Sequence, residues 1–251
     1  MTMQNDLARL SRDWETLGRL DPRWAVLADN DKRGGGWDDA SFFGTGRTVV
    51  RETLDFVQSV GANPARTARA LDFGCGVGRL SRALSDHFDR VDGVDIAASM
   101  VAQAEAANAG REQIAFHVNT ETDLRLFADD TFDLVFSYIT LQHIPTPLAL
   151  SYIREFVRVA APGGTVVFQA PYRTNNPGWK YYVDSALPGL AAAYRGVRYG
   201  AATHNDVYTH DSAEVSEALT EAGATIARVQ ANRPGDCPGW VSALYIARIP
   251  A

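Results

Sequence analysis

Residues Leu71 to Leu80 read Leu-Asp-Phe-Gly-Cys-Gly-Val-Gly-Arg-Leu, a short apolar run that leads into glycines at 74, 76 and 78. A glycine directly after a strand lets the backbone turn sharply and lets a ligand lie against the main chain. Fifteen residues after the last glycine, a second run ends in Gly93-Val94-Asp95-Ile96. A glycine turn followed by an acid at the end of the next strand predicts a site for an adenosine-containing cofactor.

Short apolar runs alternate with helical patterns on both sides of this pair, as in a parallel sheet wrapped by helices. Strands are expected at 69–73, 91–96, 114–119, 132–138 and 165–170, and helices at 78–88, 97–109 and 147–160. Thr146 is expected to cap the third of these helices, and Asp211 a later one that ends near residue 222. Segments 225–229 and 240–249 predict an antiparallel hairpin. The expected fold is an α/β, Rossmann-like, doubly wound and mostly parallel seven-stranded sheet.

The chain is expected to consist of an N-terminal cap and a main domain that contains the sheet. Residues 1–65 are expected to form an N-terminal helical cap, with helices at 6–17 and 39–60 and an irregular stretch at 21–36. Residues 66–251 would form the main domain, with an insertion at 172–210 that is rich in tyrosine, tryptophan and histidine and shapes a pocket.

Composition narrows the possible partners. The net charge is −6, with 46% hydrophobic and 22% charged residues, and no basic stripe is present, which argues against a nucleic-acid substrate. No apolar run approaches the roughly 20 residues that cross a bilayer, and no signal peptide is evident at the N-terminus. We therefore expect a cytoplasmic protein with no membrane partner, and a homodimer stays open. The two cysteines show no metal-ligand spacing, and the spacing of His204, Asp206 and His210 is too loose to predict a metal.

The glycine spacing separates this chain from dinucleotide-binding proteins. Their GxGxxG pattern places a pyrophosphate over a helix, whereas here the third glycine comes one position early and Asp72 precedes the loop. This stretch resembles motif I of class I S-adenosylmethionine-dependent methyltransferases. The resemblance extends to Asp95, to Thr131-Phe132-Asp133-Leu134-Val135 and to Ala161-Pro162-Gly163-Gly164.

The resemblance implies S-adenosylmethionine as the cofactor and an acid that holds both ribose hydroxyls, here Asp95. Where many relatives bind the adenine amino group with an aspartate, this chain has Asn119 and Thr120. In similar proteins the N-terminal segment closes over the methionine end, so Arg47 would pair with the cofactor carboxylate, and Trp37, Phe42 and Phe43 would screen the sulfonium. The cofactor-binding residues expected on this basis are Asp72, Gly74, Cys75, Gly76, Gly78, Asp95, Ile96, Asn119, Thr120, Ser137 and Arg47.

His143 is the candidate general base. It follows the fourth predicted strand, and the carboxyl ends of parallel strands form the binding crevice of such sheets. With an unperturbed pKa of about 6.5, a histidine can take a proton from a hydroxyl nucleophile; a role as pocket wall or loop tie is the alternative. The acceptor-binding residues expected from the insertion are Tyr172, Trp179, His204 and Tyr208.

The sequence therefore predicts a methyltransferase that acts on a small molecule, by O-methylation of a sugar or natural-product hydroxyl through in-line methyl transfer. An N-methyltransferase of a small amine is the nearest alternative. An NAD(P)-dependent oxidoreductase and a cofactor-binding protein without catalysis are rivals from other classes. No metal is expected.

Overall fold

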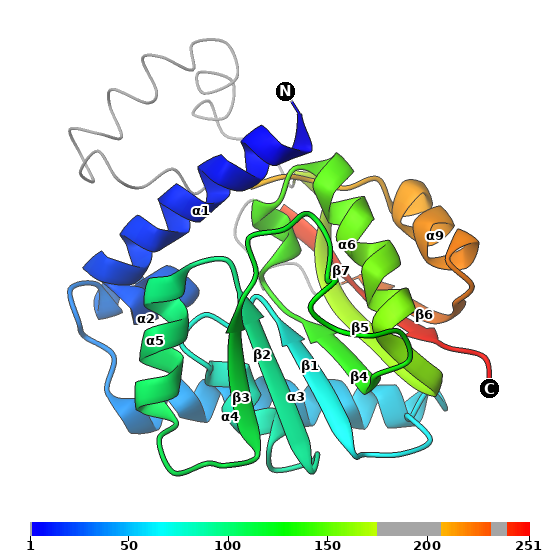
Figure 1. The fold of residues 1–251 in the computed structure, drawn as a ribbon, viewed down its shortest axis with the longest axis horizontal. Coiled ribbons are helices and arrows are strands. Elements are labelled where there is room, and N and C mark those ends of the chain that lie inside the picture. Colours follow the sequence, from blue (N-terminus) through cyan, green and yellow to red (C-terminus); the bar gives the residue numbers. More distant parts are fainter. Residues whose placement is uncertain (1, 175–206, 232–239) are drawn as a thin grey trace.

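A seven-stranded sheet forms the centre of the computed structural model, which describes residues 2–174, 207–231 and 240–251 (Figure 1). The strand order is β3-β2-β1-β4-β5-β7-β6, and only β7 runs antiparallel to its neighbours. The predicted fold class is therefore confirmed. The strands are β1 (Arg69–Phe73), β2 (Arg90–Asp95), β3 (Ile114–Val118), β4 (Phe132–Ser137), β5 (Ala160–Thr174), β6 (Thr225–Ala231) and β7 (Trp240–Arg248).

Helices cover both faces of this sheet, with α6 in front of it and α3 behind it in Figure 1. Because β1 and β4 are buried along almost their whole length, apolar residues occupy most of their positions. The helices of the described residues are α1 (Met3–Leu20), α2 (Pro22–Val26), α3 (Asp39–Ser59), α4 (Arg79–Leu84), α5 (Ala98–Ala107), α6 (Thr146–Val159) and α9 (Ser212–Glu221), with 3-10 turns η1 (Asn30–Lys32) and η2 (Leu141–His143).

The helices pack into the core through separate apolar clusters. Phe156 of α6 and Leu219 of α9 belong to a cluster on one face, which also takes in Leu7 and Leu10 of α1. Val50 and Val57 of α3 join α4 in a second cluster against the sheet. The N-terminal helices therefore contribute to the core of the molecule as well as covering one edge of the sheet.

Two local expectations were wrong. The stretch 21–36 is not irregular throughout, because α2 begins at Pro22 and the Asp21 carboxylate accepts hydrogen bonds from Trp24 N at 3.4 Å and Gly34 N at 2.6 Å. Thr146 does not cap α6; the helix begins at Thr146 itself, and the hydroxyl lies 3.1 Å from His210 Nδ1. The other predicted cap is confirmed, since Asp211 Oδ1 accepts from Ala213 N at 2.7 Å.

Candidate functional site

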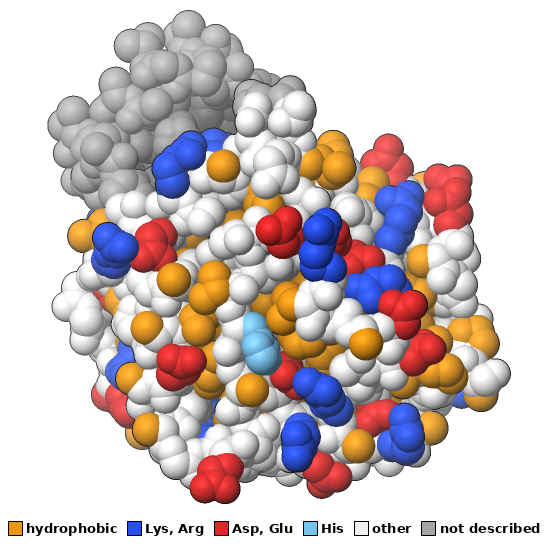
Figure 2. Space-filling model, viewed as in Figure 1, with side chains coloured by type: hydrophobic (Ala, Val, Ile, Leu, Met, Phe, Trp, Pro, Cys, Tyr) orange, Lys and Arg blue, Asp and Glu red, His pale blue; other side chains and the backbone are white. Residues whose placement is uncertain are grey.

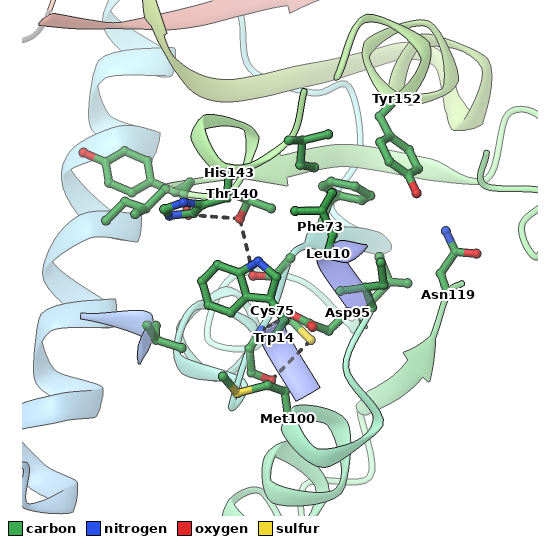
Figure 3. Close-up of a pocket in the computed structure, with 18 of the residues that line it drawn as sticks. Leu10, Trp14, Phe73, Cys75, Asp95, Met100, Asn119, Thr140, His143 and Tyr152 are labelled. Carbon is green, nitrogen blue, oxygen red and sulfur yellow. Dashed lines mark hydrogen bonds between the residues drawn. The ribbon is translucent and has the colours of Figure 1, made fainter. Parts of the chain in front are cut away.

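A cavity opens at the carboxyl ends of β1, β2 and β4, where the doubly wound topology predicts a ligand. Helices α1 and α2 cover it. Figure 3 shows Asn119 at one end, His143 and Thr140 at the other, and Asp95 and Cys75 between them. The lining is mostly apolar, with contributions from Leu7, Leu10, Trp14, Ala25, Val26, Phe73, Gly74, Cys75, Gly76, Arg79, Leu80, Val94, Asp95, Ile96, Met100, Asn119, Tyr138, Ile139, Thr140, His143, Ile144, Leu148 and Tyr152.

The glycine loop forms the floor of this cavity, and two of its glycines have no room for a side chain. Gly74 has a φ of 76°, and an added Cβ would lie 2.7 Å from the Cβ of Thr140. At Gly78, with a φ of 77°, a Cβ would lie 2.6 Å from Asn108 Nδ2. Glycine tolerates both the left-handed backbone and the close contact. Gly78 does not itself line the cavity but lets α4 begin directly beneath it.

Asp95 is fixed by the backbone that surrounds it. Its Oδ2 accepts from Gly76 N at 2.9 Å and its Oδ1 from Ala97 N at 3.0 Å. Burial raises the pKa of this carboxyl above its usual range. Each carboxylate oxygen has a second lone pair, so both can still accept from a vicinal diol. The geometry therefore fits a carboxylate that holds two ribose hydroxyls.

Asp72 and Cys75 lie on either side of the turn. Asp72 is fully buried; its Oδ2 accepts from Ser81 Oγ at 2.6 Å, while its Oδ1 has no partner among the described residues. Burial raises the pKa of Asp72 to about 6. Cys75 lines the cavity, and burial raises the pKa of its thiol, so this side chain acts as a small apolar wall rather than a thiolate.

The three remaining polar candidates lie in different environments. Asn119 lines the cavity, and its side chain bonds the loop that follows, donating to Asp123 O at 2.9 Å. Thr120 is exposed and outside the lining. Ser137 is buried and donates to Phe73 O at 3.0 Å, so it joins β4 to β1 away from the cavity.

The N-terminal segment does not reach the cavity with the residues that were expected there. Arg47 is exposed and absent from the lining. Phe42 and Phe43 pack against Met100 and Leu17 in the core, and Trp37 lies edge-on to Phe42. The screening role stays a prediction, but all three aromatics lie outside the described cavity lining, and Phe42 and Phe43 lie on the face of α3 that is buried in the core. Trp14 of α1 does line the cavity.

His143 lies in η2, immediately after β4, and is 6% exposed. Its Nε2 lies 2.9 Å from Gln142 Nε2, so the amide donates to the ring and the ring proton is on Nδ1. The Trp14 ring packs edge-on against the imidazole with centroids 5.1 Å apart. The imidazole is thus oriented by its neighbours and forms part of the cavity wall.

Of the expected acceptor-binding residues, two lie within the described chain. Tyr208 accepts from Arg9 Nη2 at 2.7 Å, and its backbone N–H donates to Gln142 O at 2.7 Å, so it joins α1 to the turn that carries His143. Tyr172 lies on β5, which runs four residues beyond the predicted end, and packs against the core outside the cavity lining. Trp179 and His204 lie outside the described residues.

Several lining residues had not been predicted. Leu7, Leu10 and Trp14 come from the apolar face of α1, and a helical pattern alone does not say which cavity such a face covers. Arg79 follows the glycine loop and is only 2% exposed. The sequence does not show that this arginine is buried. Ile139 has a φ of 63°, which is a genuine outlier for a β-branched residue.

Charged side chains of both signs alternate on the face shown in Figure 2. Among the described residues, ion pairs join Arg158 to Asp129 at 2.6 Å and Arg125 to Asp123 at 2.7 Å. Across the described ranges, no helix is long and apolar enough to cross a membrane, and no cluster of three histidine, cysteine or acidic residues is arranged to hold a metal.

A glycine turn after β1, an acid at the end of β2 and a cavity across both define an S-adenosylmethionine site. Comparison with known proteins agrees: residues 71–168 match the family described as a methyltransferase domain. In sequence, the chain is similar to trans-aconitate 2-methyltransferase of Streptomyces avermitilis, with 28% identity over 195 residues, 74% of this chain and 68% of that protein.

It is also similar to ubiquinone biosynthesis O-methyltransferase of Xanthomonas campestris, with 34% identity over 122 residues, 48% of this chain and 49% of that protein. The matched segment thus spans about half the length of that relative. In structure, it is similar to magnesium protoporphyrin IX methyltransferase of Synechocystis with bound S-adenosylhomocysteine, at a TM-score of 0.65 and 20% identity over 96% of this chain and 99% of that one.

Residues 71–168 therefore form a methyltransferase domain, and the chain is an S-adenosylmethionine-dependent enzyme with the class I methyltransferase fold. The predicted enzyme class and cofactor are confirmed. The individual site residues and the 1–65 and 66–251 division stay predictions.

Proposed function

We propose that this enzyme methylates a hydroxyl oxygen of a small molecule, such as a sugar or a natural product. The observation that carries the proposal is the place of His143: an oriented imidazole in the cavity wall, at the end opposite Asn119. A general base in this position speeds methyl transfer to a hydroxyl group by taking its proton, whereas methyl transfer to an amine depends less on a base.

The residues of the cavity fit the cofactor and divide the work. Asp95 and Asn119 of the cavity lining would hold the adenosine end. Asp72 lies outside that lining, but its buried, unpartnered Oδ1 would attract the ammonium group. When bound, S-adenosylmethionine supplies an already activated methyl group. The chain therefore mainly aligns the acceptor and excludes water, and alignment alone can lower the barrier by roughly 7–11 kcal/mol.

His143 would accept the proton of the acceptor hydroxyl at Nε2. In the structure Gln142 donates to that nitrogen, so the hydroxyl would replace the Gln142 amide when the acceptor binds. Trp14 and the neighbouring leucines of α1 would exclude water from the same space. The names of the relatives include both O- and N-methyltransferases, which leaves an amine acceptor as the alternative.

The test is formation of S-adenosylhomocysteine from a panel of sugars, phenols, carboxylic acids and amines. With a hydroxyl acceptor, His143→Ala should lower kcat by about 10²–10⁴-fold, with little change in the dissociation constant of S-adenosylhomocysteine. The matched control is His87→Ala, at an exposed histidine outside the cavity. Turnover of amines only, or near-normal turnover of His143→Ala, would contradict the proposal.

A further inference from the structure

Arg79 is a buried cation in the wall of the cofactor cavity. It follows the last glycine of the loop, is 2% exposed and lines the same cavity as Gly74 and Asp95. Its Nη1 lies 3.3 Å from Thr45 Oγ1, and its Nε has no hydrogen-bond partner in the described part of the chain. A buried guanidinium is costly unless an anion or several acceptors compensate it.

The protein supplies only part of that compensation. Asp72 attracts the guanidinium, but no ion pair within 4.0 Å joins the two among the described residues, and Asp72 Oδ2 is used by Ser81. Burial lowers the pKa of Arg79 to about 10, so the side chain is still charged at neutral pH. Beneath the glycine loop there are thus a cation and a carboxyl group that each retain an unused polar atom.

This pair matches the charges of an amino-acid group. Asp95 and Asn119 mark one stretch of the cavity for the adenosine, whereas Arg79 enters the lining from the first position of α4, directly after the glycine loop. The methionine part of the cofactor carries one ammonium and one carboxylate. A guanidinium binds a carboxylate through charge-assisted hydrogen bonds, which are about twice as strong as neutral ones.

We propose that Arg79, rather than Arg47, binds the carboxylate of the cofactor. Arg79 is then a cofactor-binding residue that fixes the methionine end, and through it the position of the sulfonium. The inference rests on the S-adenosylmethionine assignment and is independent of the acceptor proposed above.

The test compares two ligands that differ only in the carboxylate: S-adenosylhomocysteine and its decarboxylated analogue. Calorimetry on the wild type should show S-adenosylhomocysteine bound about 10- to 100-fold more tightly. In Arg79→Met this preference should fall to within about threefold, with the affinity for the decarboxylated analogue nearly unchanged, as expected when one charge-assisted contact is lost. Arg79→Lys, which keeps the charge, should retain part of the preference.

Arg82→Met is the matched control, because Arg82 lies on the same helix but donates to Asn108 at 2.8 Å outside the cavity lining; it should keep the wild-type preference. Arg47→Ala should keep it too. A wild type that binds both ligands equally, an unchanged preference in Arg79→Met, or a preference lost in Arg47→Ala would each overturn the proposal. If Arg79→Met does not fold, the proposal is tested by the preference for S-adenosylhomocysteine over the decarboxylated analogue in the wild type and in Arg79→Lys. Failure to find a hydroxyl acceptor would affect none of these binding ratios.

Discussion

At the scale of single residues, Gly74 connects the glycine loop to the turn that carries His143. Its left-handed backbone and the contact with Thr140 both exclude a side chain. Gly74→Ala should lower the free energy of unfolding by about 3 kcal/mol, through backbone strain plus overpacking. It should also weaken S-adenosylhomocysteine binding, because Thr140 must move.

Gly61→Ala separates these two causes. Gly61 has a φ of 68° but nothing lies within 4 Å of the position of an added Cβ. Only backbone strain acts at that position, so Gly61→Ala should lower the free energy of unfolding by about 1 kcal/mol and leave the cofactor affinity normal. Chemical denaturation and calorimetry measure both quantities. Equal losses in the two variants would show that the Thr140 contact is unimportant.

His210 is a buried neutral histidine with a pH-dependent contribution to stability. Its Nε2–H donates to Leu141 O at 2.9 Å and its Nδ1 lies 3.1 Å from Thr146 Oγ1, while burial lowers its pKa despite the attraction of Glu214. Below about pH 6.5 the unfolded chain binds a proton that the folded chain does not, so stability falls with falling pH.

His210→Gln should therefore be less stable than wild type at pH 8, with a difference that narrows toward pH 5. Denaturation at several pH values measures this, and the wild-type slope that His210 contributes cannot exceed about 1.4 kcal/mol per pH unit. His87→Gln, at an exposed position, serves as control. A constant difference between wild type and His210→Gln would mean that folding does not lower the pKa of His210.

The sequence could reveal a site residue where local backbone structure sets its position, and could not where burial or a distant partner sets it. Asp95 and the glycine loop follow from spacing, because backbone turns and strand ends set their positions. Arg47 and Arg79 could not be ranked, since a sequence does not show that one arginine is exposed and the other buried. The hydroxyl of Thr146 bonds His210, a partner 64 residues away, so local capping rules failed there.

At the scale of elements, a side chain of α1 caps the N-terminus of α5 and so attaches the two helices to each other. The N-cap residue of α5, Ala97, has no side chain that can accept a hydrogen bond. Instead, Glu15 Oε2 of α1 accepts from Ser99 N at 2.9 Å, and Gln103 Nε2 donates to Gly18 O at 2.7 Å. Because α1 also lines the cavity, these bonds hold the cover over the cofactor.

Glu15→Ala should release this cover in part. We expect S-adenosylhomocysteine to dissociate about 3- to 10-fold faster, as for the loss of one capping interaction. Stopped-flow displacement measures the rate. Arg19→Ala is the control, because it removes the exposed ion pair with Glu15 but leaves the bond to Ser99. Equal acceleration in both variants would assign the effect to the ion pair.

The strands were predicted to within a residue or two, except β5. Buried parallel strands are short, mostly apolar segments between turns, and β1 and β4 fit this pattern. The β5 strand extends to Thr174 because β7 pairs with it there, and such pairing between distant segments leaves no local signal. The short α2 was missed because five residues are too few to show a helical period.

At the scale of the whole molecule, the N-terminal region has two different roles. Val50 and Val57 of α3 are fully buried with Leu84 and Phe136 in the core, whereas α1 covers the cavity. Removal of residues 1–20 should leave a cooperatively folding protein with weaker S-adenosylhomocysteine binding. Removal of residues 1–65 should abolish cooperative unfolding, because several large side chains lose their partners.

Circular dichroism during thermal unfolding, together with calorimetry, tests both truncations. If the protein without residues 1–65 unfolded cooperatively and bound the cofactor normally, residues 1–65 would form a separable cap. If the protein without residues 1–20 failed to fold, α1 would be part of the essential core.

The left-handed backbone of Ile139 bears on how this enzyme can change. The turn it occupies leads directly to Thr140 and η2, so the strain of a β-branched residue there is borne by the segment that positions the wall of the cavity. Glycine or asparagine would relieve that strain. Selection for heat resistance alone would thus favour replacing Ile139, and a thermostable descendant obtained in this way would be expected to turn over its acceptor more slowly.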